Sequence, residues 1–94
     1  MKKNISNNKR KELKKKAYAL KPIIIIGQNG LTDAVIKEID IALNAHELIK
    51  VRAKGSDKDK RTEYCLKIKE KLNVDIIHRI GFITVFYREP PETV

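Results

Sequence analysis

The stretch IIIIGQNGLT at residues 23–32 decides how the chain is expected to fold. Its first four residues, Ile23–Ile26, are an unbroken run of β-branched side chains, which predicts a strand buried on both faces. The tetrad GQNG at residues 27–30 contains two glycines that suit a tight turn. Thr32 is a good N-cap for the apolar-periodic segment that follows it. The stretch therefore predicts a strand, a short loop and the start of a helix.

The segments on either side of this stretch alternate between helical and strand periodicity. We expect helices at about 7–20, 33–45 and 58–72, and strands at 23–26, 48–54, 75–80 and 82–88. This order, α-β-α-β-α-β-β, predicts an α/β fold. Two βαβ crossovers and a closing hairpin near Gly81 would make a small four-stranded mixed sheet with packed helices. We expect one domain over residues 1–94, with a C-terminal tail from about 89, because Pro90 and Pro91 cannot continue a ladder.

The first and third helices have narrow apolar stripes. In the first helix, Leu13, Ala17 and Leu20 recur at spacings of four and three, and we expect these residues and Tyr18 to be used in the core. The expected buried positions of the third helix are Cys65, Ile68 and Leu72. Most of the surface of the first helix is thereby left to lysine.

The positive charge is concentrated at the N-terminus. The net charge of the chain is +9, and residues 1–22 carry nine Lys and Arg against one Glu. Lys14, Lys15, Lys16 and Lys21 belong to this group. A localised positive field attracts a polyanion. The alternatives are a solubilising segment and a helix lying on an anionic membrane. The membrane alternative is disfavoured because the apolar stripe offers little bulk for insertion.

The expected strand at 48–54 alternates in a way that separates two faces. Ile49, Val51 and Ala53 would face the core, and Lys50, Arg52 and Lys54 would share the other face. Three cations cannot be buried without partners, so we expect an open, positively charged sheet face. Arg79 and Arg88 would extend this patch if the register of the last two strands matches. The alternative is an ordinary solvated face.

The glycine loop at 27–30 lies between a strand end and a capped helix start. Free N–H groups and the helix dipole favour an anion there, and glycines allow close approach of a nucleic-acid backbone. The alternative is an ordinary βα turn. Asp33 in the first helical turn favours that alternative, because it would repel a phosphate.

The sequence supports no enzymatic activity. No Gly-Lys-Ser/Thr follows the glycine loop, which excludes a nucleotide-binding P-loop. Cys65 occupies a core position and should be inert, and His46 and His78 have no carboxylate at a catalytic spacing. We therefore expect no catalytic residue, no metal and no cofactor.

The chain shows no targeting or membrane signal. The N-terminus leads into lysines and not into an apolar segment, so we expect no signal peptide. The longest apolar run has the length of one strand, far short of the ~20 residues that a membrane span needs. We expect a cytoplasmic protein with no membrane partner.

Several stretches, in this order, resemble the CRM domain of bacterial YhbY-type proteins. They are Leu20-Lys21-Pro22, residues 27–32, residues 46–51, Ile80-Gly81 and Tyr87-Arg88. The resemblance spans about residues 8–90. The sequence departs from the family at Ala53-Lys54-Gly55, which is less aliphatic than expected, and at Arg79, where a small or aliphatic residue is usual.

The resemblance implies a fold similar to the C-terminal domain of translation initiation factor three, with the last strand inserted between the second and third. It also implies RNA binding through the glycine loop and the adjacent basic surface, and Lys21, Lys50 and Arg88 match recurring basic positions. The candidate RNA-binding residues are Gly27, Gln28, Asn29, Gly30, Lys14, Lys15, Lys16, Lys21, Lys50, Arg52, Lys54, Arg79 and Arg88.

The resemblance further implies a cellular role. Stand-alone bacterial members of the family are associated with assembly of the large ribosomal subunit, and plant relatives carry such domains in intron-splicing factors. We therefore expect ribosomal RNA and pre-large-subunit particles as partners of a monomeric chain. One alternative is a general nucleic-acid-binding protein or RNA chaperone without a ribosomal role. An RNA-acting enzyme would need a catalytic group that the sequence does not show.

Overall fold

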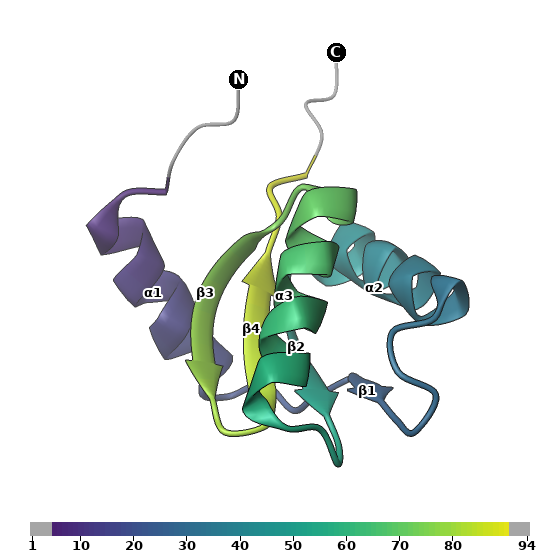
Figure 1. Cartoon of the computed structure of the whole chain (residues 1–94). Coiled ribbons are helices and arrows are strands. Elements are labelled where there is room, and N and C mark those ends of the chain that lie inside the picture. The colour runs from purple at the N-terminus through teal and green to yellow at the C-terminus, as the bar shows by residue number, and fades with distance from the viewer. Residues whose placement is uncertain (1–4, 91–94) are drawn as a thin grey trace.

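The computed structural model describes residues 5–90 and has the expected order of elements (Figure 1). The elements are α1 (Asn7–Ala17), β1 (Ile24–Ile26), α2 (Asp33–His46), β2 (Leu48–Ala53), α3 (Lys58–Leu72), β3 (Asp75–Ile80) and β4 (Ile83–Tyr87). Lys2 and Lys3 of the N-terminal charge cluster lie outside the described residues, as do residues 91–94 of the expected tail. The prediction of the fold class is confirmed.

The four strands form one mixed sheet in the order β1-β2-β4-β3. β1 runs parallel to β2, and β4 runs antiparallel to both β2 and β3. A tight turn joins β3 to β4, and Gly81 has a φ of +55° there, which favours glycine. The hairpin places β4 between β2 and β3, so the strand order implied by the family resemblance is confirmed.

The main core lies between one face of the sheet and the helices α2 and α3. Because strand residues alternate between faces, β2 sends Ile49, Val51 and Ala53 into this core, as predicted. Both helices begin at capping side chains. Thr32 Oγ1 accepts from the Val35 N–H at 3.2 Å, and Asp57 Oδ1 accepts from the Lys60 N–H at 2.8 Å.

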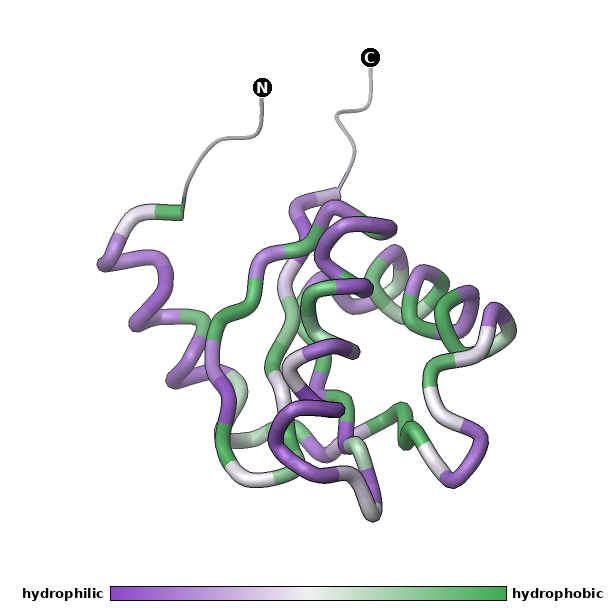
Figure 2. Tube along the Cα trace, in the orientation of Figure 1, coloured by the Kyte–Doolittle hydropathy of each residue, from purple (hydrophilic) through white to green (hydrophobic). Residues whose placement is uncertain are grey.

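Helix α1 packs on the opposite face of the sheet, and Figure 1 shows the sheet between α1 and the other two helices. It buries Leu13 and Ala17 against Ile77, Val85 and Tyr87. Elsewhere α1 is hydrophilic, as Figure 2 shows. Arg10 adds a contact by donating from Nη1 to the carbonyl of Ile76 at 2.6 Å. α1 is thus attached to the sheet by a small apolar contact.

Helix α1 ends at Ala17, before the predicted end at Leu20. The chain then tightens into a turn, in which the Leu20 N–H donates to the Ala17 carbonyl at 3.0 Å. Tyr18 and Leu20 are 78% and 37% exposed, so the prediction that they belong to the core was wrong. The turn directs the chain away from the helix and toward β1, which carries both side chains off the buried stripe.

The prediction that residues 23–26 are buried on both faces was also wrong. Ile24 and Ile26 are buried, but Ile23 and Ile25 are 52% and 57% exposed. β1 is an edge strand, and α1 contacts β2 and β3 on the face to which Ile23 and Ile25 belong. One face of β1 is therefore left without a covering helix.

Arg88 joins the ends of three elements. Its backbone N–H donates to the Glu47 carbonyl at 3.0 Å, and its guanidinium donates to the carbonyl of Leu72 at 3.0 Å. The guanidinium also lies 2.9 Å from Asn44 Oδ1 and 2.8 Å from Asp40 Oδ1. The Leu72 carbonyl is in the last turn of α3, where no helical N–H reaches it. Arg88 thus clamps α2 and α3 to the end of β4.

Replacing Arg88 by Ala should lower the free energy of unfolding by about 2–3 kcal/mol, because charge-assisted hydrogen bonds to two helices are lost together. Urea denaturation followed by circular dichroism would measure this. Arg52→Ala is the matched control: Arg52 is exposed, so its loss should change stability by no more than about 0.5 kcal/mol. Equal stability of the two variants would contradict the role of Arg88 as a clamp.

Candidate nucleic-acid interface

The glycine loop, residues 27–30, is a tight turn in which the Gly30 N–H donates to the Gly27 carbonyl at 3.0 Å. Gly30 has a φ of +74°, and a Cβ there would lie 3.2 Å from Tyr64 Oη of α3. The fold therefore favours glycine at position 30. A Cβ at Gly27 would meet no atom within 4 Å, and its φ lies outside the left-handed region. The two residues between the glycines are exposed.

The end of β2 lies beside this loop. The backbone N–H of Lys54 donates to the Ile26 carbonyl at 3.0 Å, directly before Gly27. Thr32 already accepts from one N–H at the start of α2, and Asp33 adds a negative charge in the first turn. The start of α2 is therefore already capped by one side chain and carries a negative charge in its first turn.

Lys50, Arg52 and Lys54, here called the β2 row, connect the glycine loop to the end of α1. At one end, Lys50 Nζ donates to the carbonyl of Leu20 at 2.9 Å. At the other end, Lys54 contacts β1 through the hydrogen bond to Ile26. The three residue steps from Lys50 to Ala53, where β2 ends, span roughly 10 Å, and Lys54 follows directly. The row therefore links the basic end of α1 to the glycine loop.

The face that carries the β2 row is only partly open, in contrast to the prediction. Val85 and Tyr87 belong to this face and are buried under α1. Lys50, next to them, is half-buried, whereas Arg52 and Lys54 are exposed. Helix α1, with two buried residues, covers the half of the face formed by Ile77, Val85 and Tyr87. The open half lies toward β1.

Arg79 and Arg88 do not extend the patch. Arg79 pairs with Thr84, which pairs with Val51, so it belongs to the face that packs on α2 and α3. Its Nη2 donates to Thr62 Oγ1 of α3 at 3.0 Å. Arg88 is on the same face and is engaged in the clamp described above. The register required for an extended patch is therefore absent, and neither arginine lies with the β2 row.

The lysines of α1 divide into two groups. Lys14, Lys15 and Lys16 are exposed in its last turn, where cations also stabilise the helix dipole. Only Lys16 of these three lines the pocket beside the helix, which it shares with Lys21 and Lys50. Tertiary structure therefore gathers three of the predicted cations around one cavity and leaves Lys14 and Lys15 outside it.

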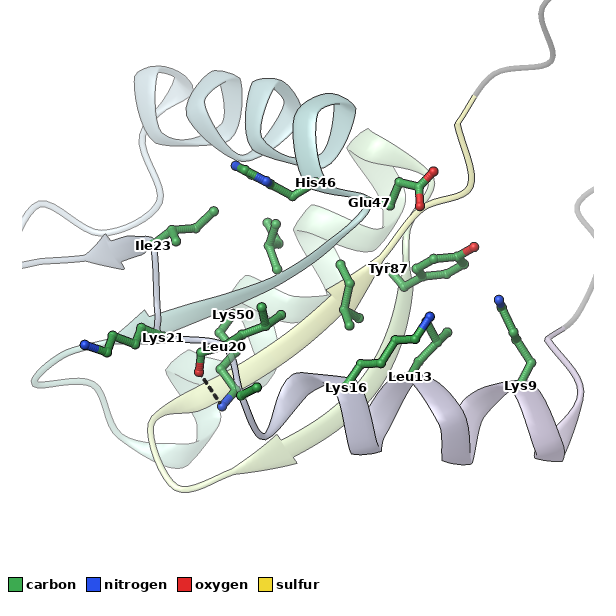
Figure 3. A pocket seen from close by; sticks show the side chains of 13 residues that line it. Lys9, Leu13, Lys16, Leu20, Lys21, Ile23, His46, Glu47, Lys50 and Tyr87 are labelled. Carbon is green, nitrogen blue, oxygen red and sulfur yellow. Dashed lines mark hydrogen bonds between the residues drawn. The ribbon is translucent and has the colours of Figure 1, made fainter.

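This pocket has a volume of about 480 Å³ and lies between α1 and the C-terminal end of α2 (Figure 3). Its apolar lining includes Leu13, Leu20, Ile23 and Leu48. Lys9 is a fourth lysine in the lining, and His46 and Glu47 are contributed by the end of α2. Figure 3 shows Glu47 and Tyr87 close together at one end and Lys21 and Ile23 at the other. We call this cavity the α1–α2 pocket.

Tyr87 contributes the phenol of the α1–α2 pocket. Burial raises the pKa of this phenol, and the nearby carboxylates of Glu89, Glu47, Asp75 and Glu12 raise it further. The neutral form is therefore favoured at physiological pH, and Tyr87 can donate a hydrogen bond.

Sequence reasoning did not single out several residues of this surface. Lys58 and Lys60 are exposed cations at the start of α3, where positive charge opposes the helix dipole. Lys60 lies one turn before Tyr64, which packs on the glycine loop. Asp57 and Asp59 balance that charge in the same turn, so the pattern carried no signal for these lysines. The gathering of Lys9, Glu47 and Tyr87 around a pocket had no signal either, because three separate elements supply them.

Within residues 5–90, no helix is long and apolar enough to cross a membrane. The same part of the chain holds no group of three or more His, Cys, Asp or Glu side chains placed to hold a metal ion. Cys65 is buried, with Sγ 3.3 Å from Thr84 Oγ1.

A mixed sheet with a glycine loop and a connected basic surface is typical of a small nucleic-acid-binding domain. The model of the CRS1/YhbY (CRM) domain family matches residues 5–88, and the chain belongs to this family. The solution structure of a hypothetical protein from Staphylococcus aureus is similar, with a TM-score of 0.80 and 30% identity. The match covers 97% of this chain and 95% of the other.

Curated relatives extend the comparison. An RNA-binding protein of Haemophilus influenzae is 38% identical over 94% of this chain and 89% of its own length. A probable RNA-binding protein of Pseudomonas aeruginosa is 33% identical over 94% of this chain and 85% of its own length. The chloroplastic CRS2-associated factor 2 of Oryza sativa is 32% identical over 67% of this chain, which corresponds to 10% of that protein.

The two glycines of the loop should respond differently to the same substitution. Gly30→Ala should lower the free energy of unfolding by about 1–2 kcal/mol, because alanine is strained at positive φ and its methyl group would press on Tyr64. Gly27→Ala should change it by no more than about 0.5 kcal/mol. Thermal melting of the two variants is the measurement. A larger loss for Gly27→Ala than for Gly30→Ala would show that this account of the loop is wrong.

Proposed function

We propose that this chain binds RNA along a continuous surface that runs from the end of α1, over the β2 row, to the glycine loop. The observation that carries the proposal is the connection made by β2: Lys50 contacts Leu20 at one end and Lys54 contacts Ile26 at the other. The similarity to relatives in H. influenzae and P. aeruginosa that are named RNA-binding proteins supports the choice of ligand.

The chemistry of this surface favours contacts to the RNA backbone. Its side chains are mainly Lys and Arg, which neutralise phosphates without reading sequence. At the glycine loop, Gly27 has open space where a side chain would be, so a sugar-phosphate backbone can come close to the start of α2. Binding along this surface would then depend on the shape and charge of the RNA more than on its sequence.

Reversing the charge of the β2 row should weaken RNA binding. In the Arg52→Glu/Lys54→Glu variant, a carboxylate near a phosphate costs about 1–4 kcal/mol, so affinity should fall at least about tenfold. Both residues are exposed, and the melting temperature should change little. Fluorescence anisotropy with a structured RNA, at several salt concentrations, is the measurement, and the salt dependence of the variant should be shallower.

The matched control is Lys67→Glu/Lys71→Glu. It makes the same change in net charge at exposed positions of α3, which packs on the other face of the sheet. Its affinity should stay within about threefold of the original chain, because a surface charge farther away than the ~10 Å Debye length is screened. If both double variants lose affinity equally, net charge alone drives binding and the proposed surface is incorrect.

We further propose that the bound RNA is ribosomal, and that the chain associates as a monomer with precursors of the large ribosomal subunit. This finer proposal rests on the resemblance to bacterial YhbY-type proteins. On sucrose gradients of a cell lysate, the chain should sediment with large-subunit precursors, and the Arg52→Glu/Lys54→Glu variant should remain near the top. An unaltered chain found only at the top of a low-salt gradient would favour a general nucleic-acid-binding role instead.

A further inference from the structure

We propose that the α1–α2 pocket takes one unpaired nucleobase of the bound RNA, and that Glu47 selects a base with an exocyclic amino group. This inference rests on the proposed function, because it assumes that an RNA strand follows the β2 row. The pocket would recognise a base, whereas the rest of the proposed surface contacts the RNA backbone.

The size and lining of the pocket suit a planar ring. A volume of about 480 Å³ falls within the range of small-ligand sites. Leu13, Leu20 and Ile23 contribute apolar surface from α1, from the turn after it and from the approach to β1. Tyr87 adds an aromatic ring and a phenol. A few polar groups placed on an otherwise apolar lining are the usual means by which such a site orients its ligand.

The charges of the pocket indicate a ligand with both anionic and hydrogen-bond-donor groups. The lining includes Lys9, Lys16, Lys21 and Lys50, and one acidic residue, Glu47. A ligand with phosphates alone would leave the carboxylate of Glu47 without a hydrogen-bond donor. A nucleotide in RNA combines phosphates, which the lysines attract, with a base whose amino group can donate to a carboxylate. Lys50 lines the pocket and also begins the β2 row, so a strand that follows the row passes the mouth of the pocket.

Glu47 occupies a backbone conformation that its side chain does not favour. It ends α2 with φ 65° and ψ −47°, whereas α3 ends at Asn73 with the left-handed values φ 55° and ψ 51°. Asparagine and glycine are the usual residues at positive φ, and glutamate is not. Two backbone hydrogen bonds hold Glu47 in place, to Leu43 and from Arg88. Strained residues of this kind cluster at ligand-binding sites, and here Glu47 is one of the residues that line the pocket.

Glu47 and Tyr87 together match one edge pattern among the bases. The carboxylate accepts from an amino group, as in the pairing of glutamate with the amino group of cytosine. The Tyr87 phenol can donate to the neighbouring ring nitrogen. Cytosine and adenine present this pair, an amino group beside a ring acceptor. Uracil presents a carbonyl oxygen where the amino group would be, and that oxygen would face the carboxylate of Glu47.

The test uses the full chain with hexamers of cytidine or uridine at one fixed salt concentration. Isothermal titration should show tighter binding of the cytidine hexamer. Amide chemical shifts in NMR spectra should change at Leu48 and Ile23 as well as along the β2 row. Glu47→Gln should reduce the preference for cytidine by about fivefold or more, because an amide can donate to uracil as readily as it accepts from cytosine. Glu38→Gln, an exposed carboxylate of α2 outside the pocket, should leave the preference unchanged.

A third variant separates binding from folding. Glu47→Gly removes the strain at positive φ, so it should melt no lower than the original chain, and it should lose the preference for cytidine. Loss of folding in the glutamine variant would therefore leave the glycine variant as the test. A glycine variant that keeps the full preference would overturn the role of Glu47.

The remaining outcomes distinguish this inference from the proposed function. If the cytidine hexamer binds but shifts only the β2 row and the glycine loop, RNA binding stands and the pocket proposal fails. Absence of binding by any hexamer or structured RNA defeats both. If an oligoglutamate peptide shifts the amides of the pocket and the cytidine hexamer does not, the pocket serves a protein partner and the proposal of a nucleobase is overturned.

Discussion

The pairing of β2 with a neighbour on each edge is the constraint on which the rest of the structure depends. β1 lies on one edge and β4 on the other, so the period-two alternation of β2 is fixed over its whole length. Ile49, Val51 and Ala53 must then enter the core under α2 and α3, and Lys50 and Arg52 must point to the other face. A slip of one residue would bury cations and expose the core, so the same hydrogen bonds set both the stability of the fold and the position of its positive charge.

Much of the fold could be predicted from the sequence, because short-range patterns determine it. Thr32 and Asp57 are capping residues that start α2 and α3 in the structure as they do in the sequence pattern. The alternation of β2 predicted its buried residues correctly. Of the candidate interface, the glycine loop and the end of the β2 row lie together, as the family resemblance implied. Whether they bind RNA stays a prediction, but their proximity follows from a parallel pairing of two consecutive strands.

The errors came where distant elements decide the outcome. The local sequence pattern could not predict the position of α1, which lies over β2 and β3 and leaves Ile25 of β1 uncovered. The bulge and the register of β3 against β4 place Arg79 opposite Thr84. Arg88 is engaged in hydrogen bonds to α2 and α3. Neither arginine therefore lies on the face that carries the β2 row. The pocket depends on the angle of a helix against a sheet, which no spacing within the sequence encodes.

The modest attachment of α1 has a thermodynamic consequence. Two buried side chains, a hydrogen bond from Arg10 to Ile76 and a contact of Lys9 with the Tyr87 ring hold the helix to the sheet. A hydrogen bond from Lys50 to Leu20 holds the turn that follows it. An element with so few contacts opens at a lower free energy than the global unfolding of the chain, and its amides exchange with solvent through that partial opening. Because α1 forms one wall of the pocket, a ligand bound there favours the closed helix by mass action. Ligand binding and the docking of α1 are therefore coupled equilibria, and each reports on the other.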